Sequence, residues 1–146
     1  VSLGHELVTD VSKIQFIHPP SIPIEEPGFA FSLAYAIVEG AAEVLGVPSN
    51  DLNATIAYGN EGFSIPPIIL YDNVPGGAGL VARLVEKNIL RDSLETARKR
   101  VSGTCGCGEN DSCYGCLRSY RNQFTHQYLQ RGPVLHYLEK VLAKWS

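Results

Sequence analysis

The chain has 146 residues, a length that fits one domain with its own hydrophobic core. Hydrophobic residues make up 45% of it and charged residues 18%, a composition that excludes a disordered polymer. No apolar run approaches the roughly 18 residues of a membrane span, and no signal-peptide pattern opens the chain. We therefore expect a single domain over residues 1–146 that is located in the cytoplasm and has no membrane partner.

The charge is divided unevenly along the chain. Residues 1–82 hold nine acids and one base, whereas residues 83–146 hold six acids and eleven bases. The net charge of −3 argues against a dedicated nucleic-acid-binding protein, so any contact with an anionic polymer is expected in the C-terminal half. Methionine is absent, position 1 included, and we interpret the chain as a domain cut from a longer protein.

The first half predicts strands around one buried helix. Val, Ile and Thr in residues 6–17 favour a strand. Residues 29–45 form a long apolar segment that ends before Gly46, and its apolar side chains cover most of a helix circumference, which predicts a buried helix. Residues 51–58 and 66–71 predict two further strands, in a hairpin or a mixed sheet.

The second half predicts helices. One amphipathic helix is expected through Leu80 and Leu84, and another over residues 89–101, whose last turn holds three bases that suit a helix C-terminus. Residues 117–129 and 133–145 predict two more. Together the elements predict an α+β fold, in which a small mixed β-sheet of three or four strands is packed by helices.

A glycine-rich loop follows the predicted strand at 66–71. Backbone amides at such a strand-to-helix junction can hold a phosphate or a carboxylate. The loop has neither the ending of a Walker A motif nor the glycine spacing of a dinucleotide-binding fingerprint. It is therefore either a tight turn that lets a helix pack closely or a candidate anion-binding loop formed by Gly76, Gly77 and Gly79.

All four cysteines fall within twelve positions, in the pattern C-x-C-x5-C-x2-C. Each close pair lets two thiolates converge on one soft cation, which predicts tetrahedral Zn²⁺. Four thiolates fill the coordination shell and leave no place for a reactive water, so the site is predicted to be structural. Two disulfides or an iron–sulfur cluster are the alternatives. The predicted metal ligands are Cys105, Cys107, Cys113 and Cys116.

The segment after the last cysteine is polar and basic. Arg118, Arg121 and Asn122 lie three and four residues apart and would share one face of a helix. The arginines suit phosphate contacts, contacts with another protein surface, or internal pairing with Asp10 or Asp72. The candidate contacts to nucleic acid or to another domain are Arg118, Arg121, Asn122, Gln123 and His126.

No catalytic residue is predicted. An acid–base pair of His126 with Asp72 has no support from the spacing, which leaves a cryptic hydrolase or nuclease as a remote alternative. The sequence contains neither a Walker A lysine motif nor a Walker B-like run that ends in paired acids, so ATP hydrolysis is not expected of this chain.

Three stretches belong together: residues 32–42, residues 70–79, and the four cysteines with the Leu-Arg-Ser-Tyr-Arg-Asn-Gln segment and the histidine that follow. Together they resemble a known family, the helicase-associated MZB domain. That family is found at the C-terminus of Mrf- and Hrq-type superfamily 2 DNA helicases and in related phage-defence proteins.

The resemblance implies a zinc-binding accessory module whose four cysteines match those of the family. Such a module supports the motor domains of an ATP-dependent DNA helicase, or of a DNA-translocating defence protein, without hydrolysing ATP itself. The implied setting is DNA repair or phage defence, the implied partners are the motor domains and DNA, and the implied cofactor is structural Zn²⁺. A protein-interaction module without nucleic-acid contact is the alternative.

Overall fold

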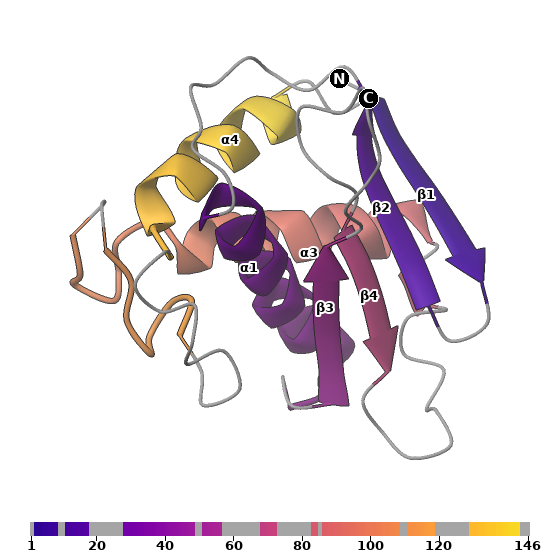
Figure 1. The fold of residues 1–146 in the computed structure, drawn as a ribbon, viewed down its shortest axis with the longest axis horizontal. Coiled ribbons are helices and arrows are strands. Elements are labelled where there is room, and N and C mark those ends of the chain that lie inside the picture. The colour runs from indigo at the N-terminus through magenta and orange to yellow at the C-terminus, as the bar shows by residue number, and fades with distance from the viewer. Residues whose placement is uncertain are drawn as a thin grey trace.

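A computed structural model describes residues 2–8, 11–17, 28–48, 51–56, 68–72, 83–84, 86–108, 111–118 and 129–143. Its elements in chain order are β1 (Ser2–Val8), β2 (Val11–Ile17), α1 (Gly28–Leu45), β3 (Leu52–Ile56), β4 (Ile68–Asp72), α3 (Lys87–Arg100) and α4 (Arg131–Ala143). Helix α1 lies between the sheet and α3, and α4 packs against α3 and α1 (Figure 1). This arrangement confirms the expected α+β class.

The four strands form one sheet in the order β1-β2-β4-β3, and each neighbouring pair is antiparallel. The expectation of a mixed sheet is therefore corrected to an antiparallel one. A parallel pair needs a crossover of a dozen or more residues. Only two residues separate β1 from β2, and eleven separate β3 from β4, so consecutive strands here return antiparallel.

One expected strand is in fact two. The segment 6–17 spans the end of β1 and all of β2, which pair with each other from Val8 and Val11 outward. Apolar residues continue on both sides of Thr9 and Asp10, and neither of these is a glycine. The sequence pattern therefore gave no signal of a boundary between two strands. The bounds of β3 and β4 differ from the predicted ranges by one or two residues.

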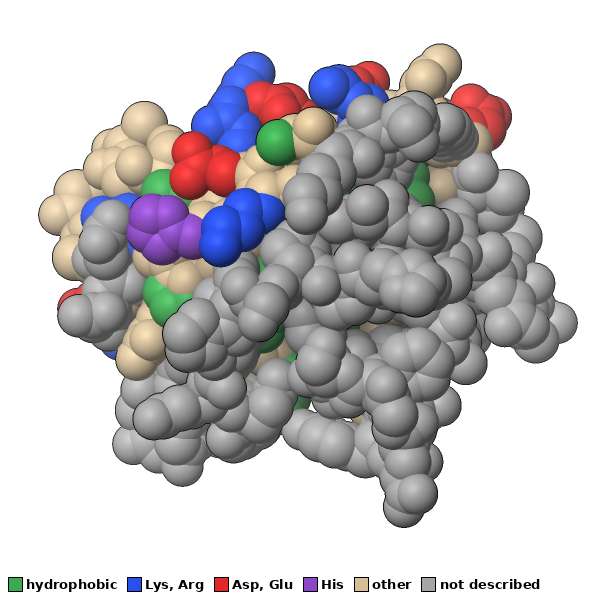
Figure 2. Space-filling model, turned by 90° about the horizontal axis from the view of Figure 1, so that it is seen from above, with side chains coloured by type: hydrophobic (Ala, Val, Ile, Leu, Met, Phe, Trp, Pro, Cys, Tyr) green, Lys and Arg blue, Asp and Glu red, His purple; other side chains and the backbone are tan. Residues whose placement is uncertain are grey.

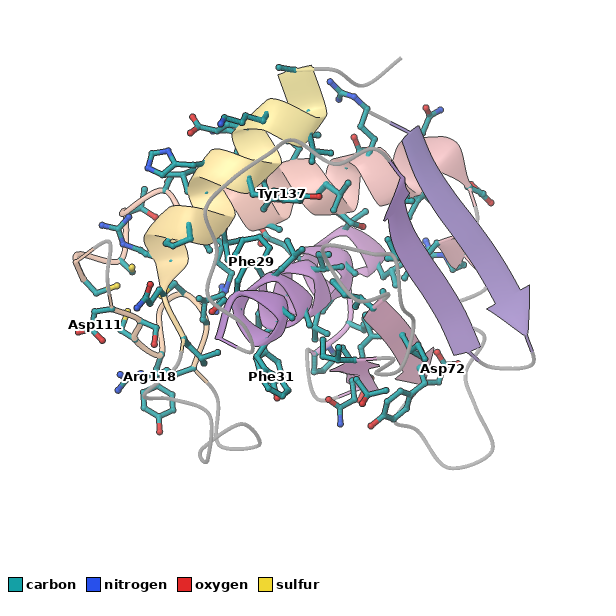
Figure 3. All side chains as sticks on the ribbon, turned by 45° about the horizontal axis from the view of Figure 1, so that its top comes forward. Phe29, Phe31, Asp72, Asp111, Arg118 and Tyr137 are labelled. Carbon is teal, nitrogen blue, oxygen red and sulfur yellow. The ribbon has the colours of Figure 1, made fainter. Side chains whose placement is uncertain are left out.

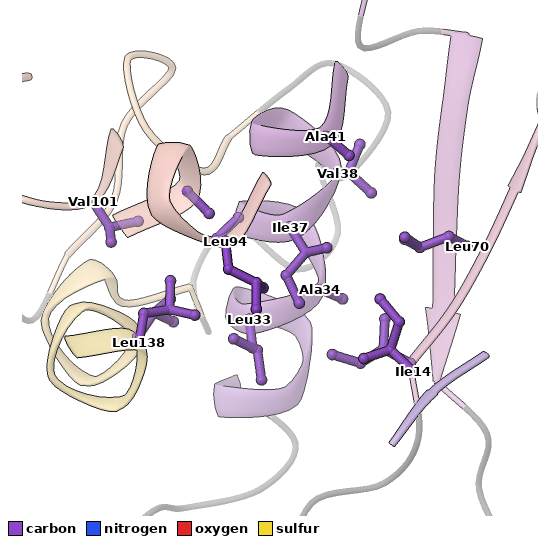
Figure 4. Packing of buried hydrophobic residues seen from close by; sticks show 14 of the residues in the cluster. Ile14, Leu33, Ala34, Ile37, Val38, Ala41, Leu70, Leu94, Val101 and Leu138 are labelled. Carbon is purple, nitrogen blue, oxygen red and sulfur yellow. The ribbon is translucent and has the colours of Figure 1, made fainter. Parts of the chain in front are cut away.

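Helix α1 is buried on two opposite sides. Leu33 faces Leu94 of α3, whereas Ala34 and Val38 face Leu70 of the sheet (Figure 4). At Gly40 the backbones come close enough that an added Cβ would lie 2.2 Å from the carbonyl oxygen of Ser93. Two-sided burial explains why the sequence of α1 is apolar around most of its circumference.

Helix α1 ends immediately before Gly46. Gly46 has a φ of 74°, the left-handed conformation that glycine adopts without strain. The amide of Val47 donates to the carbonyl of Ala42, and the amide of Gly46 donates to that of Glu43, which together form a Schellman motif. The predicted end of the helix is thus confirmed together with its mechanism.

Helices α3 and α4 each begin two residues before their predicted starts. Helix α4 begins at Arg131, so Pro133 lies within its first turn, where the missing amide costs no helical hydrogen bond. Tyr137 on its inner face meets the ring of Phe29 edge-on, with 5.3 Å between ring centroids. Figure 3 shows Tyr137 pointing toward α1.

Two helix predictions lie largely outside the described residues. The one around Leu80 is represented only by residues 83, 84 and 86. Of the one over 117–129, the described residues Leu117, Arg118 and Leu129 are not helical, and Leu117 belongs to a turn.

On the face of Figure 2, acidic and basic side chains are interspersed among the coloured residues. None of the described helices has the length and apolar character needed to cross a lipid bilayer.

Candidate metal centre

The four cysteines lie in the loop that follows α3, at the end of the molecule away from β1 and β2 (Figure 1). Val101, the C-cap of α3, is fully buried, and so is Cys116. The other three cysteines are half-buried. The loop is therefore anchored to the core at both ends while its centre stays near the surface.

The sulfur atoms have the spacing of a tetrathiolate site. All four Sγ atoms lie within 4.8 Å of one another. The Sγ of Cys107 is 3.4 Å from that of Cys105 and 3.7 Å from that of Cys116, and the Sγ atoms of Cys113 and Cys116 are 3.9 Å apart. A tetrahedron with Zn–S bonds of about 2.3 Å places its sulfurs about 3.8 Å apart. The residues therefore fit a zinc ion.

Disulfides are not what brings these cysteines together. All four thiols are free. A disulfide holds its sulfurs at about 2.05 Å, well below the separations seen here.

Tight turns produce this convergence. Gly106, between the first two cysteines, has a φ of 90°. The amides of Cys116, Leu117 and Arg118 all donate to the carbonyl of Cys113, at 3.1, 3.1 and 3.0 Å. A Cβ on Gly115 would lie 2.9 Å from the Cβ of Cys105, so the two cysteine pairs meet at a point where only glycine fits without a shift.

Comparison with known families identifies this arrangement. The family model described as MZB, the MrfA Zn-binding domain, matches residues 33–117. This range runs from α1 through all four cysteines. The chain belongs to the MZB family.

Two solved structures share the fold. One is the crystal structure of the DUF1998 helicase MrfA bound to DNA, at a TM-score of 0.60 and 18% identity, covering 90% of this chain and 17% of that one. The other is MrfA bound to DNA and AMPPNP, at a TM-score of 0.51 and 17% identity, covering 94% of this chain and 21% of that one. This chain thus spans about a fifth of the helicase chains it matches. No curated protein matches it.

The thiols of this MZB domain differ in acidity. Burial raises the pKa of Cys116 to about 12. Burial also favours the neutral form of Cys105, but hydrogen bonds from the backbone of Cys107 and from the neighbouring thiols lower its pKa to about 7. Metal ligands must be thiolates, so binding displaces protons, and zinc loading is expected to weaken as the pH falls.

Three arginines hold the loop. Arg100 of α3 donates from Nε to the carbonyl of Cys116 at 2.7 Å. Arg131 of α4 donates to the carbonyl of Cys107 from Nε at 2.9 Å and from Nη2 at 2.6 Å. Neither arginine was predicted from the sequence as a site residue. A signal existed for Arg131, because a base in the first turn of a helix opposes the helix dipole and needs a local reason.

Arg118 is the third, and it pairs inside the loop. Its Nε donates to Ser112 Oγ at 2.9 Å, and its Nη2 lies 3.2 Å from Asp111 Oδ1. Figure 3 shows Asp111 and Arg118 side by side near the sulfur atoms. Internal pairing was one of the roles considered for this residue, but the partner is Asp111 rather than Asp10 or Asp72. The remaining predicted contacts and the glycine-rich loop lie outside the described residues, namely Arg121, Asn122, Gln123, His126, Gly76, Gly77 and Gly79.

Proposed function

We propose that this chain is a structural, zinc-binding accessory module of a DNA helicase or of a DNA-translocating defence protein. In this proposal Cys105, Cys107, Cys113 and Cys116 bind one Zn²⁺. The observation that carries it is the convergence of four free thiols at tetrathiolate spacing within the range that matches the MZB family.

The role of the metal would be to hold the loop on the helices. With four thiolates as ligands, Zn²⁺ contributes folding energy and has no open position for a substrate or a reactive water. The loop leaves α3 at Val101 and is tied to the start of α4 by the amide of Arg131, which donates to the carbonyl of Asp111 at 3.1 Å. A metal in the loop thereby fixes where these two helices meet.

The basic segment after Cys116 would face DNA or the motor domains. Arg118 is bonded to Ser112 and Asp111, so the start of this segment is attached directly to the metal loop. A fixed frame of this kind suits a contact that must keep its register. Residues 121–126 supply the other candidate contacts, and direct DNA contact is part of the proposal.

Metal analysis tests the central step. Protein purified without chelator is expected to hold one zinc per chain, and Cys113→Ser is expected to reduce that content strongly. Ser102→Ala is a suitable control, because Ser102 is exposed in the same loop and its hydroxyl donates to the nearby Lys99 carbonyl. Zinc well below one equivalent in the wild type would end the proposal.

DNA contact needs a separate measurement in the parent protein. An Arg118→Ala/Arg121→Ala double variant is expected to lower DNA affinity and to reduce the salt dependence of binding. If the variant and the wild type bind DNA with equal affinity and equal salt slope, and binding to the motor domains is intact, the module would be a protein-interaction module without nucleic-acid contact.

A further inference from the structure

The three arginines around the metal loop differ in how their charge is balanced. Arg100 lies 3.6 Å from a carboxylate oxygen of Glu39, and Arg118 lies 3.2 Å from one of Asp111. Within the described part of the chain Arg131 has no carboxylate partner; its guanidinium donates to backbone carbonyls and also interacts with the Cys107 thiol. Among the residues that the structure describes, two of the three charges thus have a carboxylate partner and that of Arg131 does not.

Arg131 is also the most deeply buried of the three. It is 8% exposed, and its Nη1 reaches the carbonyl of Val101 at 3.3 Å in addition to the two bonds to Cys107. The space for the guanidinium exists because Gly103 has no side chain: a Cβ there would lie 3.2 Å from Nη2. The backbone of Gly103 has a φ of 103°, which favours glycine at that position as well.

A buried cation without an anion is unfavourable, because carbonyl dipoles replace only part of its hydration. A zinc tetrathiolate would supply the missing charge, since one Zn²⁺ and four thiolates together carry two excess negative charges. The carbonyl that Arg131 bonds twice belongs to Cys107, itself one of the four cysteines. Hydrogen bonds next to a metal ligand orient that ligand and tune the affinity of the site.

We propose that Arg131 is the counter-charge and the positioning residue of the metal centre. Seated in the space beside Gly103, it fixes the backbone of Cys107 and balances the negative charge of the loaded site. This inference rests on the proposed zinc ligation. It adds that zinc affinity depends on a residue of α4, which lies outside the cysteine loop and outside the matched family range.

The test is zinc affinity, measured in the 146-residue chain by competition with a chromophoric chelator. Arg131→Met removes the charge and keeps most of the length, and it is expected to weaken zinc binding by about ten- to a hundredfold. Arg131→Lys keeps the charge and is expected to recover part of the loss. Arg98→Met, on α3 and already paired with Glu95, is the matched control and is expected to change the affinity by less than about threefold.

A second readout separates positioning from simple packing. The visible spectrum of the Co²⁺-loaded protein reports on the geometry of the thiolates, and Arg131→Met is expected to shift it because Cys107 loses two hydrogen bonds. Unchanged affinity and an unchanged spectrum in Arg131→Met would overturn the proposal. So would an Arg131→Lys variant that loses as much affinity as Arg131→Met, because the charge would then have no role.

If Arg131→Met does not fold, a comparison of two glycine variants tests the same role. Gly103→Ala pushes a methyl group against the guanidinium, whereas Gly46→Ala imposes a similar left-handed strain at a position with nothing within 4 Å. Zinc affinity is expected to fall in the first variant only, and equal affinity in both would refute the role of Arg131. A wild type that binds no zinc would refute the proposed ligation itself, which the metal analysis above detects separately.

Discussion

The core around α1 and the loop that carries the cysteines are held by different forces. In the core, Leu33, Ile37 and Leu94 are fully buried and belong to one hydrophobic cluster, so the hydrophobic effect and close packing hold α1 to α3. In the loop, Arg100, Arg118 and Arg131 hold the chain by hydrogen bonds to carbonyls and a hydroxyl, while Tyr114 is 61% exposed. Packing therefore holds the core. The loop is buried mainly at its ends, at Val101 and at Cys116 and Leu117, and we expect the proposed metal to hold its centre.

Removing the metal should separate the two regions most clearly. We expect Cys113→Ser, or extraction of zinc by a chelator, to lower the free energy of unfolding by several kcal/mol. Amide hydrogen exchange should become faster in residues 102–118 and at the start of α4, while the centre of α1 stays protected. An unchanged melting temperature in Cys113→Ser would show that the loop holds itself without metal.

The reverse experiment disturbs the core and leaves the loop intact. An alanine at Gly40 would place its Cβ 2.2 Å from the Ser93 carbonyl oxygen and 2.8 Å from the Ala97 amide nitrogen, so α1 and α3 must move apart. We expect Gly40→Ala to cost about 3 kcal/mol of stability, with zinc content unchanged at temperatures where the protein is folded. Denaturant unfolding checks the loss of stability, and metal analysis of the same sample checks the zinc content. Loss of zinc from the folded variant would mean that the two regions are not separable.

A third variant addresses packing inside the loop. Gly115→Ala would bring a methyl group to 2.9 Å from the Cβ of Cys105 and 3.4 Å from the Sγ of Cys113. We expect it to lower zinc affinity and to cost about 1–2 kcal/mol in the metal-loaded protein, because the two cysteine pairs must separate. Gly108→Ala is the matched control, since nothing lies within 4 Å of its Cβ position. Equal melting temperatures for the two variants would show that the glycine is not needed for convergence.

The same contrast explains what could be predicted from the sequence. The apolar run that ends at Gly46 predicted α1 almost to the residue, because helix burial and capping are local. The cysteine spacing predicted the metal site for the same reason. The order of the strands and the partners of Arg131 could not be predicted, because they depend on distant residues: Arg131 bonds residues 24 and 30 positions away. Polar contacts between residues so far apart in the chain produce no periodic pattern in the sequence.

The smallest change in stability is expected at a surface ion pair on α3. Glu95 and Arg98 lie one turn apart, and the hydrogen bond from Arg98 lowers the pKa of Glu95. Both side chains are partly exposed, so solvent screens their attraction, and a double-mutant cycle of Glu95→Gln with Arg98→Met is expected to give a coupling of about 0.3–0.5 kcal/mol. Because the pair is screened, the coupling should shrink further in about 1 M salt. Neither variant should change zinc content, since the pair contacts neither Arg131 nor the described residues of the loop. A coupling comparable to the cost of Gly40→Ala would contradict the assignment of the core's stability to apolar packing.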